Sequence, residues 1–294
     1  MNYFEVYNQD SFAFLKSLDD ESVDLIVTSP PYFIGKEYDK SNKIGDFLDI
    51  HHDMLPEILR VVKGGGSICW QVGNYIQNGS IIPLDSLIFA AFRCDDLILR
   101  NRIVWTFGHG THANKRFSGR HETIMWYTKG SNYHFDLDAV RVPQKYPGKR
   151  HYKGPKKGQW SGNPLGKNPS DVWDIPNVKA GHIEKTDHPC QFPVALVQRL
   201  VKALTKKDDL VIDPFCGSGS SGVAALLENR NFLGSDLSEN YCEIARTRIQ
   251  ASQNGTVRVR PLDRLVYIPS AKEAVAIRPP HFFGKIEEEG EVND

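Results

Sequence analysis

Several features that would place the chain in a common class are missing from its sequence. No run approaches the roughly 20 apolar residues that a membrane-spanning helix requires, so we expect no membrane partner. The amino terminus has no basic start followed by an apolar stretch, which argues against a signal peptide. There is no excess charge of either sign, because 36 Lys and Arg balance 36 Asp and Glu. Any surface that binds a polyanion must therefore be local.

Cysteine is sparse, and its spacing indicates neither a metal site nor a disulfide framework. The five cysteines are odd in number and include no Cys-x-x-Cys pair. We therefore expect reduced thiols in a cytoplasmic protein without a bound metal. The pair His109 and His112 lacks the helical spacing of zinc enzymes and has no obvious carboxylate partner. Its loop also carries Lys115, Arg116 and Arg120, so we interpret it as a basic loop near the substrate.

The most informative stretch is Thr28-Ser29-Pro30-Pro31-Tyr32. It follows the β-branched and apolar run 23–27, which predicts a short buried strand. The two prolines must end this strand, since neither can donate to a sheet. Ser29 is pushed into an extended conformation because it precedes a proline. The sequence thus predicts a stiff ledge with one hydroxyl and one aromatic ring, at the end of a strand where open α/β sheets bind ligands.

A second stretch places a glycine-rich turn between a strand and a helix. Residues 213–219 read Asp-Pro-Phe-Cys-Gly-Ser-Gly, after the apolar run 210–212 and before the helical run 220–228. Such a turn lets a ligand approach the backbone closely. Asp236 follows Asp213 by 23 residues, close to the roughly 20 at which a carboxylate takes a ribose hydroxyl. The glycines at 217, 219 and 222 also fit the fingerprint of nucleotide-dependent dehydrogenases, so this turn alone leaves that class open.

Together, the two stretches resemble the amino-methyltransferases of DNA, which transfer a methyl group from S-adenosylmethionine to an exocyclic base nitrogen. Their order, with Ser-Pro-Pro-Tyr first, is similar to the permuted order of the beta class, and the resemblance covers about residues 4 to 250. It implies an α/β fold of the class I methyltransferase type. We therefore expect a Rossmann-like, mostly parallel sheet with helices on both faces, a circularly permuted motif order and a basic inserted recognition region.

The resemblance also implies roles for particular residues. The catalytic residues would be Ser29, Pro30, Pro31 and Tyr32. The residues that would hold S-adenosylmethionine are Asp10, Asp213, Phe215, Cys216, Gly217, Ser218, Gly219 and Asp236. For Asp10, a carboxylate that only starts a helix is an equal alternative. The dipeptide Pro189-Cys190 is similar to the nucleophile of carbon-5 cytosine methyltransferases, but it precedes the glycine-rich turn and nothing else of that family is present, so we reject that function.

A basic insert, residues 141–185, contains ten Lys or Arg and three acidic residues, which gives a formal charge of +7. Clustered cations attract phosphates, and the interleaved aromatic residues can contact bases. In relatives this interval holds the target-recognition region. We therefore expect it to bind double-stranded DNA, with phosphate contacts from Lys149, Arg150, Lys156 and Lys157. The alternative is a solvated, disordered insert.

These observations predict four segments. Residues 1–130 form a catalytic half, 131–187 the target-recognition insert, 188–256 a cofactor-binding half and 257–294 a tail. The acidic end at 287–294 is expected to be disordered. The polar segment 33–40 is expected to be a mobile loop that closes over the substrate.

The favoured function is site-specific methylation of cytosine N4 in a flipped-out base, within a restriction–modification system. Relatives with serine before Pro-Pro usually modify cytosine N4 and those with aspartate usually modify adenine N6, so adenine N6 is the first alternative. A non-catalytic DNA-binding module is the second, and the intact cofactor motif argues against it. The Ser-Pro-Pro-Tyr motif and the basic insert argue against a dehydrogenase. A cognate endonuclease and a homodimer are open as partners.

Overall fold

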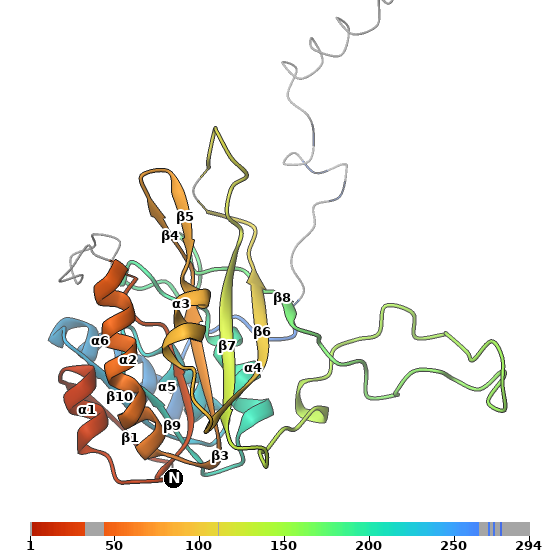
Figure 1. The fold of residues 1–294 in the computed structure, drawn as a ribbon. Coiled ribbons are helices and arrows are strands. Elements are labelled where there is room, and N and C mark those ends of the chain that lie inside the picture. The colour runs from red at the N-terminus through yellow and green to blue at the C-terminus, as the bar shows by residue number, and fades with distance from the viewer. Residues whose placement is uncertain are drawn as a thin grey trace, which may run out of the picture. The chain divides into compact units, whose positions relative to one another are not determined.

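The computed structural model of the protein describes residues 2–32, 44–110 and 112–264, together with residues 270, 273 and 277 (Figure 1). The chain divides into two units, Met1–Asp263 and Arg264–Asp294, and all the helices and strands below lie in the first. The loop expected at 33–40 and the acidic end at 287–294 lie outside the described residues.

An eight-stranded sheet in the order β1-β10-β9-β2-β3-β7-β6-β8 forms the centre of the first unit. Strands β1, β10, β9, β2 and β3 are parallel, so their carboxyl ends meet at one end of the sheet. Strand β7 is antiparallel to β3 and β6, and β8 is parallel to β6. This arrangement confirms the mostly parallel α/β fold. The strands span Phe4–Asn8 (β1), Val23–Thr28 (β2), Val62–Val72 (β3), Leu97–Thr106 (β6), His121–Lys129 (β7), Val172–Asp174 (β8), Leu210–Asp213 (β9) and Asn231–Asp236 (β10).

Two groups of helices cover the sheet, one on each face (Figure 1). On one face lie α1 (Ser11–Ser17), α2 (Ile44–Val61) and α3 (Leu84–Ala91). On the other lie α4 (Val194–Leu204), α5 (Ser220–Leu227) and α6 (Glu239–Gln253), with a short 3₁₀ helix, η1 (Asp138–Val140), packed against α4. Each face buries its own apolar cluster. The helix predicted over the run 220–228 is present as α5.

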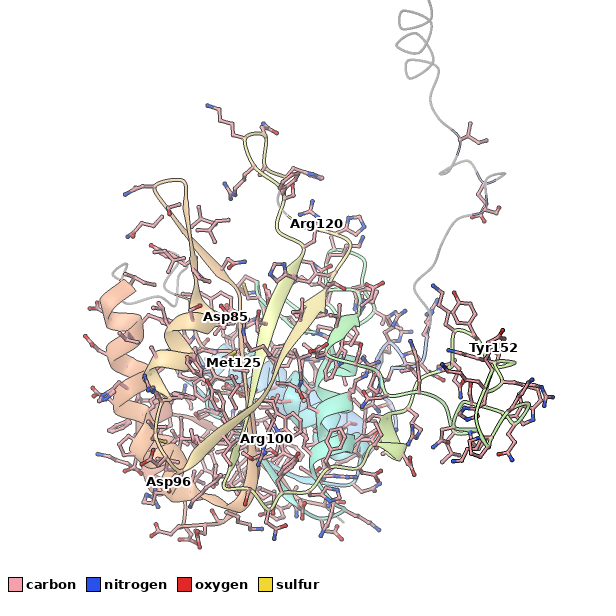
Figure 2. The ribbon with its side chains drawn as sticks, turned by 45° about the vertical axis from the view of Figure 1, so that its right-hand side comes forward. Asp85, Asp96, Arg100, Arg120, Met125 and Tyr152 are labelled. Atoms are coloured by element: carbon pink, nitrogen blue, oxygen red, sulfur yellow. The ribbon has the colours of Figure 1, made fainter. Side chains whose placement is uncertain are left out.

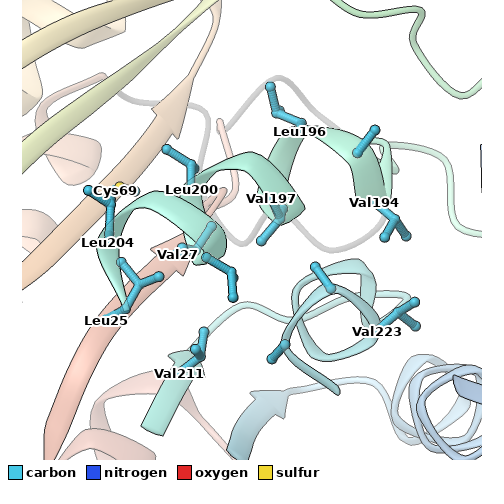
Figure 3. Close-up of a cluster of buried hydrophobic side chains, with 14 of the residues drawn as sticks. Leu25, Val27, Cys69, Val194, Leu196, Val197, Leu200, Leu204, Val211 and Val223 are labelled. Atoms are coloured by element: carbon cyan, nitrogen blue, oxygen red, sulfur yellow. The ribbon is translucent and has the colours of Figure 1, made fainter. Parts of the chain in front are cut away.

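The apolar face of α4 holds together the two strands that precede the motifs. Its side chains recur at helical spacing and are buried over Leu25 and Val27 of β2 and Val211 of β9 (Figure 3). Val197 and Leu200 are at most 3% exposed, and burying such a side chain contributes roughly 1.5–3 kcal/mol each. This packing holds the carboxyl ends of β2 and β9 next to each other.

The sequence analysis missed a β-hairpin, β4 (Asn74–Gln77) and β5 (Ser80–Pro83). Its turn is Asn78-Gly79, with φ of +51° and +82°. Both residues therefore adopt the left-handed conformation that a two-residue hairpin turn requires. The Asn-Gly dipeptide is typical of such turns, so the sequence contained enough information to predict this hairpin.

The glycine run 64–66 lies within β3. The β2–β3 register shifts between Val23 and Leu25, and Gly65 has φ of +85°, so the run forms a bulge. Helix α2 ends at Val61, directly before the strand. Strand β8 was also missed, because three residues carry too little periodicity.

The close contact between α5 and α6 predicts that replacing a glycine of α5 destabilises the protein. A Cβ on Gly222 would lie 2.4 Å from Ile249 Cδ1 and 2.7 Å from Phe232 Cδ1. Gly222→Ala should therefore lower the free energy of unfolding by about 1–3 kcal/mol, despite the higher helix propensity of alanine. Urea unfolding measures this change. Gly45→Ala on α2 is the matched control, because nothing in the described part of the chain outside its own helix backbone and neighbours lies within 4 Å of its Cβ position. A comparable loss there would contradict the packing argument.

Candidate active site

A cleft of about 730 Å³ opens where the five parallel strands end. Its lining comes from the turns after β1, β2, β9 and β10, the end of β3, helix α2 and the loop before α4. The sheet therefore brings together the two motifs, which are about 185 residues apart in the sequence. The predicted site residues that line the cleft are Asp10, Ser29, Pro30, Pro31, Tyr32, Phe215, Cys216, Gly217, Ser218 and Asp236.

The Ser-Pro-Pro-Tyr segment leaves β2 directly after Thr28, as the prolines require. Ser29 Oγ lies 3.2 Å from Tyr32 Oη, and either oxygen can be the donor. One hydroxyl can thus donate to the other, and the acceptor lone pairs that remain are available to an N–H of a ligand. Two neighbouring oxygen acceptors lie on the cleft wall.

Two residues that the sequence analysis missed surround Tyr32. Gln71 at the end of β3 donates from Nε2 to Oε2 of Glu122, near the start of β7, and both line the cleft. Burial, followed by the charge of Glu122, raises the pKa of Tyr32 well above its ordinary value, so its hydroxyl stays protonated. The β3–β7 pairing brings Gln71 to Glu122, and the sequence pattern contains no sign of it.

The glycine-rich turn packs tightly beneath the cleft. Gly217 has φ of +48°, and a Cβ there would lie 2.8 Å from His188 Nε2. Its N–H donates to Asp236 Oδ2 at 3.0 Å. The ring of His188 contacts that of Tyr241 on α6, with 4.5 Å between their centroids. His188 and Tyr241 both line the cleft and were not predicted as site residues.

The Asp236 carboxylate, at the end of β10, joins two turns. Oδ2 accepts from Gly217 N, and Oδ1 accepts from Ser238 N at 2.9 Å. Burial raises the pKa of Asp236 above its ordinary value. Because each oxygen has a second lone pair, this carboxylate can also accept hydrogen bonds from a ligand hydroxyl in the cleft.

Asp213 lies beneath the cleft, where its side chain is fully buried. Oδ1 accepts from Thr28 Oγ1 at 2.5 Å and from Phe215 N at 3.0 Å, and Oδ2 accepts from Ser221 Oγ at 2.5 Å. Its two oxygens are thus bonded to the protein itself. That Asp213 contacts the cofactor stays a prediction; its hydrogen bonds show that it links β2, the glycine-rich turn and α5.

Gly219 lies in a tightly packed turn beside α6. It precedes the first turn of α5 with φ of +74°, and its Cβ position lies 2.9 Å from Ala245 Cα of α6. It is absent from the cleft lining, so close helix packing explains this glycine. Ser218 does line the cleft, and Arg248 Nη1 donates to its carbonyl oxygen at 2.5 Å.

For Asp10 the structure shows a helix cap that also lines the cleft. Oδ1 accepts from Phe12 N at 3.0 Å and Ala13 N at 3.3 Å, so Asp10 is the N-cap of α1. Both capping hydrogen bonds go to Oδ1. The position of Asp10 is therefore compatible with a helix cap and with a cofactor contact through Oδ2.

His51 on α2 is a buried lining residue that the sequence analysis did not select. Its Nδ1 lies 2.6 Å from the Phe47 carbonyl oxygen, so Nδ1 carries the hydrogen and Nε2 is an acceptor. Nε2 has no hydrogen-bond partner in the described part of the chain. Burial lowers the pKa of His51 to about 4, which keeps the ring neutral. In sequence it is simply one residue of an amphipathic helix.

The four predicted DNA contacts lie on the basic insert and do not line the cleft. The guanidinium of Arg150 stacks 3.7 Å from the ring centroid of Trp160, which is 60% exposed. Tyr152 nearby is 90% exposed (Figure 2). Trp173, by contrast, is buried in β8. The end of the insert is therefore part of the sheet, and its middle presents cations and aromatic rings to solvent.

Residues 2–32, 44–110 and 112–264 contain no group of three or more His, Cys, Asp or Glu that could hold a metal ion. His112 Nδ1 lies 3.4 Å from Arg120 Nη2. Among the described helices, none is long and apolar enough to cross a membrane.

A parallel sheet with this cleft at its carboxyl end, floored by a glycine-rich turn and an acid on the next strand, has the architecture of class I methyltransferases. The chain belongs to the DNA methylase family, whose model matches residues 23–247. The protein is therefore a DNA methyltransferase of the family that methylates exocyclic base nitrogens.

Individual relatives agree with this assignment. The chain is 47% identical over 242 residues to the type II methyltransferase M.BglII of Bacillus subtilis, covering 82% of this chain and 67% of the relative. It is 37% identical over 255 residues to the type II methyltransferase M.ScaI of Streptomyces caespitosus, covering 84% and 81%. It is 32% identical over 255 residues to the DNA adenine methyltransferase YhdJ of Escherichia coli, covering 85% and 83%.

Solved structures share the fold. The cytosine-N4-specific PvuII DNA methyltransferase matches with a TM-score of 0.66 at 19% identity, over 87% of this chain and 93% of that chain. A Thermus thermophilus protein complexed with S-adenosyl-L-methionine matches with a TM-score of 0.61 at 24% identity, over 88% and 100%.

The buried Asp213 predicts a pH dependence of stability. Burial raises its pKa from 3.8 to about 6, outweighing its three hydrogen bonds. The stability it contributes is therefore complete below pH 4 and is lost as the pH rises through 6. The Asp213→Asn variant has no carboxyl group to ionise at this position. Its free energy of unfolding, relative to that of the parent, should therefore rise by about 3 kcal/mol between pH 4 and pH 7, because a shift of about two pKa units corresponds to 1.36 kcal/mol for each unit.

Urea unfolding at a series of pH values measures this difference. Because the charge of Asp236 also raises the pKa of Asp213, the comparison is repeated in an Asp236→Asn background. If the difference in the free energy of unfolding between variant and parent stays constant from pH 4 to pH 7, the raised pKa of Asp213 is contradicted.

Proposed function

We propose that the protein transfers a methyl group from S-adenosylmethionine to N4 of a cytosine flipped out of double-stranded DNA. The observation that carries the proposal is the pair of hydroxyls on Ser29 and Tyr32, 3.2 Å apart beside the glycine-rich turn. A base inside a duplex cannot reach this recessed ledge, so the target must leave the stack.

An exocyclic amine is a weak nucleophile because its lone pair is conjugated with the ring. The site must hold the amine in line and accept its hydrogens as the nitrogen becomes tetrahedral. The proposed acceptors are Ser29 Oγ and the Pro30 carbonyl oxygen, which belong to two residues that line the cleft. The ring of Tyr32 stacks on the flipped base, and Glu122 and Gln71 hold that ring in place.

The lining fits S-adenosylmethionine in two respects. Asp236 keeps lone pairs for ribose hydroxyls, and Gly217 leaves the turn open where a Cβ would crowd His188. Asp10 and the backbone of Phe215, Cys216 and Ser218 complete the proposed cofactor site. When bound, the cofactor supplies a methyl group already activated on a sulfonium, so the protein's own contribution is binding and orientation.

Cytosine N4 is proposed over adenine N6 because the residue before Pro-Pro is Ser29, and relatives with serine at this place usually modify cytosine N4. Adenine N6 remains the second candidate, because the relative YhdJ is named a DNA adenine methyltransferase. M.BglII and M.ScaI are named type II methyltransferases, which supports the proposal that this protein is a type II modification enzyme. We propose a cognate endonuclease as its partner. We also propose that it acts in the cytoplasm, either as a monomer or as a homodimer.

The decisive experiment identifies the methylated nucleoside. DNA incubated with the protein and S-adenosylmethionine is digested to nucleosides and analysed by mass spectrometry. We expect N4-methylcytosine. N6-methyladenine would establish the second candidate, and DNA without either product would refute methylation by this chain.

Ser29→Ala tests the catalytic assignment within that assay. The contact is proposed to strengthen in the transition state, so its loss should lower single-turnover methylation about a hundredfold, or about 3 kcal/mol, with nearly unchanged binding of cofactor and DNA. Ser29→Thr, which keeps the hydroxyl, is the matched control and should retain most of the rate. Parental turnover by Ser29→Ala would show that Ser29 has only a structural role.

The basic insert is proposed to contact DNA phosphates. Binding should weaken with salt, with a log–log slope of about −0.9 per phosphate neutralised. Replacing Lys149, Arg150, Lys156 and Lys157 with Gln should flatten the slope by about 0.9 for each contact removed. The control replaces Lys206 and Lys207, which lie before β9 at the opposite end of the sheet from the cleft. Equal slopes for both sets would place the DNA elsewhere.

A further inference from the structure

The loop that joins β6 to β7 presents an exposed aromatic ring among cations. Residues 107–121 contain Lys115, Arg116 and Arg120, three histidines and no acidic residue. Phe117 at its tip is 100% exposed. A phenylalanine ring left fully in water is unfavourable, and a partner that covers it recovers that free energy. The absence of acids favours a polyanion as the partner.

The fold holds this loop in a defined hairpin. At its base, Phe107 N donates to the Arg120 carbonyl oxygen at 3.0 Å, continuing the β6–β7 pairing. Nearer the tip, Ala113 N donates to Ser118 Oγ at 3.1 Å and closes the turn that presents Phe117. Figure 2 shows the loop rising beyond Arg120 at one end of the sheet.

Both arms of the loop begin at the cleft. Phe107, after β6, and Glu122, in β7, line it, and Phe107 packs on Trp105 with 5.1 Å between ring centroids. The shorter arm, from Phe117 to Glu122, spans five residues, which at roughly 3.3 Å each give a reach on the order of 15 Å beyond the rim. A DNA groove is only about 8 Å deep. A duplex whose target base occupies the cleft therefore lies within reach of the tip.

We propose that the β6–β7 loop enters the DNA beside the target and that Phe117 stacks in the gap left by the flipped base. The inference rests on the proposed function, since only a flipped base leaves such a gap. Lys115 and Arg116, both exposed, neutralise phosphates on either side of the tip. An apolar side chain that wedges between base steps replaces the stacking that the target has lost.

The test compares two duplexes for each variant. The recognition sequence is first read from plasmid DNA methylated by the parental protein, which also shows that the proposed function holds. One duplex is then fully paired and the other carries a mismatch at the target base, so that flipping costs less. Phe117→Ala should methylate the paired duplex about 5- to 100-fold more slowly at subsaturating DNA, as expected for the loss of one stacking contact. On the mismatched duplex its rate should lie within about twofold of the parental rate.

Two further variants separate stacking from charge. Phe117→Trp keeps a stacking ring and should stay near the parental rate on both duplexes. The double variant Lys115→Gln/Arg116→Gln should weaken binding to both duplexes equally and reduce the salt slope. If Phe117→Ala methylates both duplexes at the parental rate, or is slowed equally on both, Phe117 does not stack in the gap left by the flipped base. Either result would leave the methyltransferase assignment intact. Failure of the parental protein to methylate DNA would instead overturn the proposed function.

Discussion

One buried carboxylate joins the two motifs on which the cleft depends. Asp213 ends β9 and accepts hydrogen bonds from Thr28 at the end of β2, from the backbone of Phe215 in the glycine-rich turn and from Ser221 in α5. A buried charge is costly unless it is hydrogen-bonded, and here each bond also sets a distance between functional segments. The height of the Ser-Pro-Pro-Tyr ledge over the turn follows from this residue, although it lies beneath the cleft.

The site divides into a tightly packed floor and projecting loops. The floor is held by buried contacts, such as Gly217 against His188 and Gly219 against Ala245, and such packing leaves little room for movement. The basic insert and the β6–β7 loop, in contrast, present cations and aromatic rings to solvent. A rigid floor suits a small cofactor whose reacting atom must be aligned, and exposed loops suit a long polyanion that is bound from outside.

Burial keeps two hydrogen-bonding groups of the cleft neutral, even though the charge of Glu122 acts on one of them, Tyr32. Burial keeps the Tyr32 hydroxyl protonated and the His51 ring uncharged. Acceptor atoms without full charge can orient an amine and polarise its N–H bonds while the cleft remains suitable for an aromatic base. The Asp236 carboxylate, at the end of β10, accepts hydrogen bonds from two backbone N–H groups, which stabilise its charge.

The sequence by itself predicted the strands before both motifs and the glycine-rich turn, because periodicity, prolines and glycines act locally, and the resemblance carried by the motifs implied the mostly parallel fold. It did not reveal β4, β5, β8 or the neighbours of Tyr32, and it did not show that Asp213 and Gly219 lie outside the cleft lining. Gln71 and Glu122 meet only because β3 pairs with β7, and Asp213 is buried only because α5 and β2 close over it. Contacts of this kind depend on strand order and burial, which only the tertiary structure decides.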